Sequence, residues 1–380
     1  MKAFVSQFNF PTLIRYGYGA VRELSDHLKT EGFRNPLIIT EPATAALDFF
    51  SELRRDFCLR NQTPEIFCLT GPHLQASMIQ EGADLFNRSN CDCIVAVGGR
   101  RVMSAARGVT LLARHTGKID LFDEVHGGEK NITHPLPHLV TIPVAASGSE
   151  LWRHSELQDE QTLKKSELFS PRLMAKVVFA DPSATMELPG LKIREWRMEI
   201  MMTLLEAWMA IMNHPVCDGI AAEGLALLFE DYNETDNRDP TSLHKNLVVT
   251  SLMAGISVQK GSGLLRALSE AVADYSGNSQ GAACSVLFPI LMDFNVEYGM
   301  EKLQRLGLRL GWEERTEYAI SRKLVNWTQT LTLPSRLSEL GIHRADLESI
   351  TEIALNGRGY ITGPKLTTSS EIRSMLESAL

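Results

Sequence analysis

The chain has 380 residues, a length that favours two domains over one ordinary core. Apolar residues make up 44% and charged residues 22%, which is typical of a globular soluble protein. The formal net charge of −8 argues against nucleic acid as a partner, because a phosphate-binding surface needs clustered basic residues. No apolar run reaches the roughly 18 residues that cross a bilayer. The N-terminus lacks a signal-peptide core, so we expect a cytoplasmic protein without membrane partners.

Cysteine usage fits that compartment, and we expect no disulfides among the six cysteines. Cys91 and Cys93 form a C-x-C pair, but they lie in the apolar run 91–99, which favours a buried strand over a metal site.

Short apolar runs alternate with helical patterns over roughly the first 185 residues. The expected strands cover residues 35–42, 64–71, 91–99 and 138–147, and the expected helices cover 44–57, 74–89 and 101–115. This order predicts a Rossmann-like α/β domain whose parallel sheet is covered on both faces. Ligands of such sheets bind beyond the carboxyl ends of the strands.

The pattern becomes almost entirely helical after Asp181 and Pro182. We therefore predict two domains, an α/β domain over residues 1–185 and an all-helical domain over residues 186–380. A ligand is expected between the two halves.

Two glycines, Gly98 and Gly99, lie between an expected strand and an expected helix. Glycine lets the backbone approach a phosphate, and the start of a helix offers free N–H groups. The alternative is a tight turn without a ligand. Arg100 and Arg101 follow directly, and they either strengthen anion binding or fill the space of a pyrophosphate.

A second small-residue turn, with Ser147, Gly148 and Ser149, follows the strand at 138–147. It either holds phosphate or ribose or is a plain turn. Glu41 ends the first expected strand, where a carboxylate accepts from a ribose 2′-OH and repels a 2′-phosphate. The alternative for Glu41 is a solvated or helix-capping acid.

Five segments in the right order resemble the iron-containing alcohol dehydrogenase family, in the superfamily of dehydroquinate synthase. Residues 95–108, "VAVGGRRVMSAARG", resemble its G-G-G-S-x-x-D-x-A-K loop, and residues 197–210, "RMEIMMTLLEAWMA", resemble its G-M-D-A-L-T-H-A-I-E-A-Y helix. The other three are 8–24, 142–182 and 263–295. The resemblance implies a dehydroquinate synthase-like fold, NAD(H) as cofactor, a homodimer, and Asp181 as a further nucleotide-site residue. It places Arg100, Arg101, Ser104 and Arg107 where the family has glycine, serine, aspartate and lysine.

Members of that family hold Fe²⁺ or Zn²⁺ with one aspartate and three histidines. The resemblance places these ligands at Glu199, Thr203, Arg266 and Gln280, and a further histidine near the substrate at Glu270. Arginine offers no lone pair to a metal, and threonine and glutamine are poor ligands for these ions. We therefore expect no metal.

Charge replacement is one interpretation of this altered site. Arg266 brings a guanidinium that binds a carboxylate or phosphate and stabilises an oxyanion, held by Glu199 or by Glu270 one turn on. Glu199, Glu270 and Asp274 are then the candidates for acid or base, and Tyr275 is a further candidate proton donor. The resemblance suggests that Lys165 faces the cleft and that Gln280 completes the altered ligand set. The alternative is drift after loss of the metal, with Arg266 and Glu270 as a mere salt bridge.

Three functions follow. The first is a metal-independent oxidoreductase that uses NAD(H) on a small, anionic carbonyl or hydroxyl substrate. The second is a non-redox enzyme, such as a lyase or aldol-type catalyst, that takes a phosphorylated substrate. The third is a non-catalytic protein built on an inactive enzyme.

Overall fold

The computed structural model describes residues 10–71, 74–145, 147–158, 165–233, 240–356 and 362–380. The described chain forms two compact units, an α/β unit that ends at Glu187 and a helical unit that begins at Leu188. The sequence pattern placed this division at residue 185.

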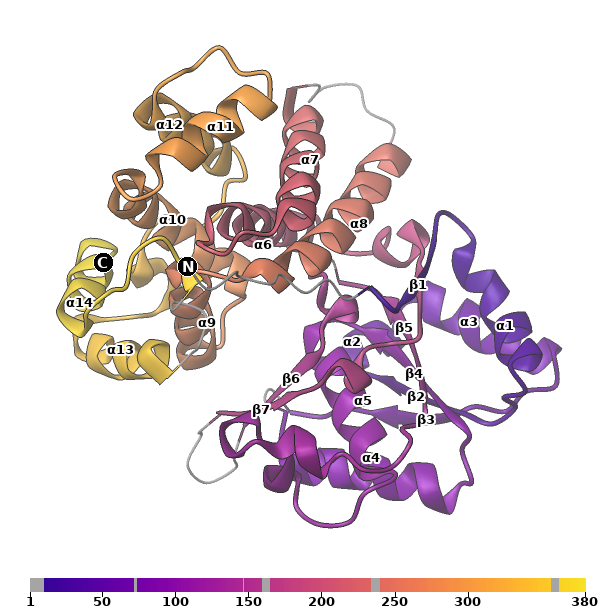
Figure 1. Ribbon diagram of the computed structural model, residues 1–380. Coiled ribbons are helices and arrows are strands. Elements are labelled where there is room, and N and C mark those ends of the chain that lie inside the picture. Colours follow the sequence, from indigo (N-terminus) through magenta and orange to yellow (C-terminus); the bar gives the residue numbers. More distant parts are fainter. Residues whose placement is uncertain (1–9, 72–73, 146, 159–164, 234–239, 357–361) are drawn as a thin grey trace. The chain divides into compact units, whose positions relative to one another are not determined.

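The described strands of the α/β unit include a six-stranded parallel sheet with the order β1-β8-β5-β4-β2-β3 (Figure 1). Its strands are β1 (Leu13–Tyr16), β2 (Pro36–Thr40), β3 (Glu65–Cys68), β4 (Cys93–Gly98), β5 (His138–Pro143) and β8 (Val177–Ala180). Every residue of β2 and β4 is buried, as expected for continuous apolar runs in a sheet covered on both faces. Gly98 pairs with Pro143, so β4 and β5 end side by side. The predicted parallel sheet is confirmed.

Helices follow the strands in the predicted alternation. They are α1 (Leu24–Thr30), α2 (Pro42–Ala45), α3 (Asp48–Leu59), α4 (Ala76–Arg88) and α5 (Arg100–Leu112). The single helix expected over residues 44–57 is wrong, because Leu47 has an extended backbone (φ −73°, ψ 145°) that separates α2 from α3. The antiparallel hairpin of β6 (His154–Gln158) and β7 (Lys165–Phe169) was not predicted.

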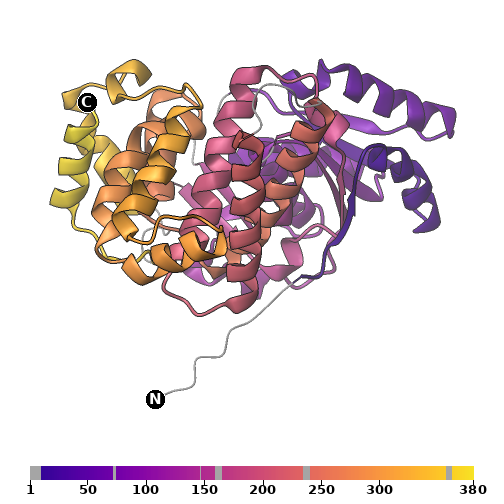
Figure 2. The same ribbon diagram turned by 90° about the horizontal axis from the view of Figure 1, so that it is seen from above.

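The helical unit is built around α6, which packs against α7, α8, α9 and α10. Its described helices are α6 (Gly190–Met209), α7 (Pro215–Asn233), α8 (Pro240–Ser257), α9 (Leu264–Ser276), α10 (Gln280–Val296), α11 (Met300–Arg309), α12 (Glu317–Gln329), α13 (Leu347–Asn356) and α14 (Ser369–Ser378). In Figure 2, α6, α7 and α8 run side by side. The side chains of α6 itself are buried on most sides of the helix, as expected for a central helix. Among the described helices, none combines the length and apolarity that a membrane crossing requires.

Candidate functional site

The first glycine turn joins the carboxyl end of β4 to the start of α5. Gly99 is the N-cap of α5, and helix residues begin at Arg100. The first N–H groups of a helix have no partner within it, and the helix dipole adds positive potential there. The N-terminus of this thirteen-residue helix, at the end of a central parallel strand, is therefore suited to bind a phosphate.

The second turn lies directly against the first. A Cβ built on Gly99 would come within 3.0 Å of the Ala145 Cβ, and the Val144 N–H donates to the Gly98 carbonyl at 3.1 Å. Gly148 adopts φ 71°, which favours glycine, and the Ser147 and Ser149 hydroxyls are 2.8 Å apart. The structure thus brings together the glycines and serines that the sequence nominated separately.

Glu41 and Arg101 interact beyond the ends of β2 and β3. Arg101 Nη1 lies 3.9 Å from Glu41 Oε2, and Arg101 Nη2 donates to the Thr70 carbonyl. Burial lowers the pKa of Arg101, and the Glu41 charge opposes that shift. Arg101 is therefore engaged beside Glu41, whereas Arg100 is the half-buried first residue of α5.

Asp181, which the resemblance predicts as a nucleotide-site residue, has a structural role in the fold. Its carboxylate accepts from the Val21 N–H at 3.1 Å and from the Ser183 N–H at 3.0 Å and hydroxyl at 2.7 Å. Asp181 is fully buried. Asp181 therefore connects the chain next to Gly19 with the end of β8, and both of its carboxylate oxygens accept hydrogen bonds from within the protein.

In the helical unit, α6 carries Glu199 and α10 begins at Gln280 (Figure 1). The two helices approach closely at Gly281, where a Cβ would lie 2.3 Å from the Glu195 carbonyl oxygen. This contact lets the Gly281 N–H donate to Glu199 Oε1 at 3.1 Å. Glu199 is thereby held at the amino end of α10, where the helix dipole favours a carboxylate.

Arg266 lies on α9 and is only 7% exposed. Its Nε is 3.0 Å from Glu270 Oε1, so the guanidinium forms an ion pair with the glutamate one turn on. Gln280 is also buried, and its Nε2 lies 3.2 Å from the Ser269 hydroxyl, the neighbour of Glu270. Burial raises the pKa of the Cys284 thiol, and the charges of Glu199 and Glu270 act in the same direction.

The other three candidates are less central. The Tyr275 hydroxyl donates to Asp346 at 2.7 Å, and the ring is 43% exposed. Asp274 is half-buried one turn beyond Glu270. Lys165 is the first residue of β7, and its side chain lies outside the described part of the structure.

The donor set does not fit an iron or zinc ion. The Thr203 hydroxyl donates to the Glu199 carbonyl at 2.8 Å, Arg266 is cationic, and Gln280 offers only an amide. Across the described residues, no group of three or more His, Cys, Asp or Glu side chains is arranged to hold a metal. Among the four positions aligned with the family's ligands, only Glu199 supplies a carboxylate, which is too few ligands for these ions.

Sequence reasoning missed Glu206, which lies on α6 two turns after Glu199. Its Oε1 accepts from the backbone N–H groups of Leu265 at 2.8 Å and Arg266 at 3.2 Å, so it caps α9 from a neighbouring helix. Burial raises its pKa to about 7, against the opposing effect of these amides and of the Arg266 charge. The signal available in the sequence was an acid in the apolar run "MMTLLEAWMA".

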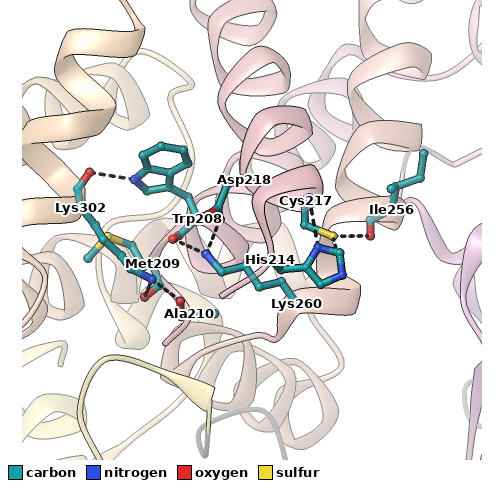
Figure 3. Close-up of polar contacts among 9 residues, drawn as sticks. All are labelled: Trp208, Met209, Ala210, His214, Cys217, Asp218, Ile256, Lys260 and Lys302. Carbon is teal, nitrogen blue, oxygen red and sulfur yellow. Dashed lines mark hydrogen bonds and ion pairs between the residues drawn. The ribbon is translucent and has the colours of Figure 1, made fainter. Parts of the chain in front are cut away.

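Two lysines anchor the carboxyl end of α6 (Figure 3). Lys260 Nζ donates to the Trp208 carbonyl at 2.9 Å and to Asp218, and Lys302 Nζ donates to the carbonyls of Met209 and Ala210. Cations and donors satisfy the free carbonyls at a helix end. The helix that carries Glu199 and Glu206 is therefore held at its carboxyl end as well as along its length.

A buried histidine–cysteine pair lies beside this anchor (Figure 3). His214 Nδ1 accepts from the Cys217 N–H at 3.2 Å, so the imidazole caps the start of α7. Burial raises the pKa of the Cys217 thiol to about 11, which keeps it protonated and unreactive. The pair is structural.

Two sequence models of one family match the chain. The model described as "Iron-containing alcohol dehydrogenase" matches residues 11–182, and "Fe-containing alcohol dehydrogenase family, C-terminal" matches residues 197–380.

Relatives match over nearly the whole length. The chain is 24% identical to the NAD-dependent methanol dehydrogenase of Bacillus methanolicus, over 99% of the chain and 100% of the relative. It is 25% identical to the 4-hydroxybutyrate dehydrogenase of Cupriavidus necator, over 97% and 98%. The solved structure of sulfoacetaldehyde reductase from Bifidobacterium kashiwanohense in complex with NAD⁺ has a TM-score of 0.85, 17% identity and 99% coverage of both chains. The chain therefore belongs to the iron-containing alcohol dehydrogenase family, a family of oxidoreductases.

Proposed function

We propose that this protein is a metal-independent oxidoreductase that uses NAD(H) on a small, anionic carbonyl or hydroxyl substrate, with Arg266 in place of the metal. The observation that carries the proposal is the buried Arg266–Glu270 pair, at positions that the sequence resemblance aligns with histidines of the family. A buried guanidinium has lost its hydration, and that cost is offset only by strong partners. A carboxylate or oxyanion is the partner that best fits its planar donors.

Each described group has a role in this proposal. NAD(H), when bound, accepts or supplies the hydride. The N-terminus of α5 and the turn at residues 147–149 bind phosphate through backbone N–H groups and hydroxyls. Arg266 binds and orients the substrate oxygen and stabilises the negative charge that develops on it. Glu270 holds the guanidinium in place through an ion pair with the Nε of Arg266.

In this proposal the Glu199 carboxylate accepts the proton that the substrate hydroxyl group releases on oxidation. Glu199 is held by the Gly281 N–H, on the helix adjacent to Arg266. A carboxylate fixed by a hydrogen bond keeps its orientation during proton transfer. Asp274 and Tyr275 are the next candidates along α9, although the Tyr275 hydroxyl is occupied by Asp346.

The anionic substrate is supported by chemistry and by one relative. The relative from Cupriavidus necator is named for 4-hydroxybutyrate, a small hydroxy acid with a carboxylate. The relative from Bacillus methanolicus is named for methanol, which carries no charge, so the family as a whole does not decide the point. Arg266 is the feature of this chain that favours the anion.

The test combines metal analysis, an NADH fluorescence titration and assays with short hydroxy acids and their carbonyl forms. We expect NADH binding without stoichiometric iron or zinc, and activity that a chelator leaves unchanged. Arg266→Met should lower kcat/KM by about a hundredfold or more, the usual effect of losing an oxyanion donor. Arg309→Met, at an exposed position on α11, is the matched control and should leave activity unchanged.

Three results would contradict the proposal in different ways. Stoichiometric iron required for activity would remove metal independence. Full activity of a folded Arg266→Met variant would make the arginine structural. Absence of NADH binding would favour the non-redox enzyme or the non-catalytic protein, and phosphate binding at the α5 N-terminus would then separate these two.

A further inference from the structure

Arg107 is a fully buried cation in the middle of α5, with no exposed surface. Its Nη2 donates to the backbone carbonyl of Ser149, which lies in the second glycine-containing turn. Its Nε and Nη1 are buried without a hydrogen-bond partner in the described part of the chain. The opposite charge of Glu150, also fully buried, stabilises the guanidinium.

Burial of the Arg107 charge carries a free-energy cost that the charge of Glu150 offsets only in part. Burial lowers the pKa of Arg107 to about 10 in spite of Glu150, which shows that the surroundings disfavour the charge. Replacing a buried ion pair by apolar side chains of similar size is often neutral or stabilising. Donors left without partners add to the cost. A buried cation with unpartnered donors therefore indicates a role beyond packing.

The position of Arg107 on α5 suggests that role. The amino end of α5 forms the first turn, and Arg107, two helical turns later, bonds the second turn through Ser149. The two turns already touch where Gly99 meets Ala145. One rigid helix therefore holds both turns, and the guanidinium sets their spacing.

We propose that Arg107 is a positioning residue that holds the turn at residues 147–149 in register with the N-terminus of α5, so that both can grip the phosphates of one dinucleotide. This inference rests on the proposed function, because it takes NAD(H) as the ligand. Arg107 is buried behind the turns and acts through Ser149 rather than by touching the ligand. Its loss should therefore weaken binding by loosening the second turn.

The test uses four variants of the full chain. Arg107→Met removes the bond to Ser149, and Arg107→Lys keeps a donor and a positive charge. Arg107→Met combined with Glu150→Leu removes both buried charges, so that the fold recovers if charge balance alone was lost. Arg172→Met is the matched control, because it removes a guanidinium bond to the Ile132 carbonyl, which belongs to neither turn.

Two readouts are measured for each variant, together with the Tm. The first is the Kd for NADH by fluorescence titration. The second is hydrogen exchange of the peptide that contains residues 147–149, which needs no ligand. We expect Arg107→Met and the double variant to raise Kd by about tenfold or more, the equivalent of one lost charged hydrogen bond. Both should speed exchange in that peptide, whereas Arg107→Lys and Arg172→Met should stay within about threefold of the wild type.

The outcomes separate the two claims. A double variant with wild-type Kd and wild-type exchange would overturn the positioning role and leave Arg107 as a charge partner of Glu150. If Arg107→Met does not fold, the double variant still decides. If the wild type does not bind NADH, the proposed function fails. Hydrogen exchange at residues 147–149 then still tests the positioning role, because it should be faster in the Arg107→Met variants than in the wild type if Arg107 orders the turn.

Discussion

The buried carboxylate of Glu206 makes the stability of the helical unit depend on pH. Its pKa rises from an ordinary value of 4.5 to about 7 on folding, because burial disfavours the charged form. Its Oε2 has no hydrogen-bond partner among the described residues. Glu206 lines a cavity of about 30 Å³ together with mostly apolar side chains, among them Met202 and Phe288, and with Asn295 and Lys365. The folded protein therefore holds a proton on Glu206 in a range where the unfolded chain has released it.

The direction in which stability changes with pH follows from proton linkage. Between pH 4.5 and pH 7 the folded state binds more protons than the unfolded state, so stability falls as the pH rises. Integrating the shift over about pH 5 to about pH 8 gives a loss of about 2.5 kcal/mol that belongs to Glu206 alone. Glu206→Gln keeps an oxygen for the N–H groups of Leu265 and Arg266 but does not titrate.

The assay is urea unfolding followed by tryptophan fluorescence at a series of pH values. The free energy of unfolding of the wild type should fall by about 2.5 kcal/mol more than that of Glu206→Gln between about pH 5 and about pH 8. Glu223→Gln, an exposed position on α7, is the matched control and should follow the wild type. Parallel curves for wild type and Glu206→Gln would show that the carboxyl has an ordinary pKa in the folded protein and would refute the reasoning.

Two further predictions concern the same unit. Gly281→Ala should cost about 2 kcal/mol or more, because its Cβ would lie 2.3 Å from the Glu195 carbonyl oxygen and push α10 away from α6. Gly219→Ala, a helical position with open space around it, should be neutral or slightly stabilising, and equal losses in the two variants would contradict the close approach. Burial and the nearby Lys260 lower the pKa of Lys302 from 10.5 to about 8, so stability should rise with pH between these values, where the folded state has already released the proton. Thermal unfolding of Lys302→Met should lack this rise, and a wild type without it would show that Lys302 keeps an ordinary pKa.

The alternation of strands and helices could be predicted because it depends on local patterns. The runs that became β2 and β4 are continuous and apolar, and this marks a parallel sheet buried on both faces. The strand β8 and the hairpin of β6 and β7 were not identified in that way. β8 is an apolar run of only four residues, and the pairing of β6 with β7 is not visible in the periodicity of either segment.

The candidate site shows the same division. The resemblance to the family pointed to Arg266 and Gln280, and the structure buries both of them. The sequence left two partners open for Arg266, and the structure records the contact with Glu270, one turn away on the same helix. Glu206 was missed because its role is to cap a helix that begins nearly sixty residues later.

By itself, the sequence determined the fold class and the two glycine-containing turns, because residue type and spacing carry them. The prediction that Arg266, Gln280 and Thr203 stand where the family has histidines came from the resemblance to that family. Only the tertiary structure decided that Arg107 reaches Ser149, that Arg101 lies beside Glu41, and which carboxyl groups are buried. Such contacts join segments distant in the chain, and the pKa of a group depends on the burial and charge that those contacts create.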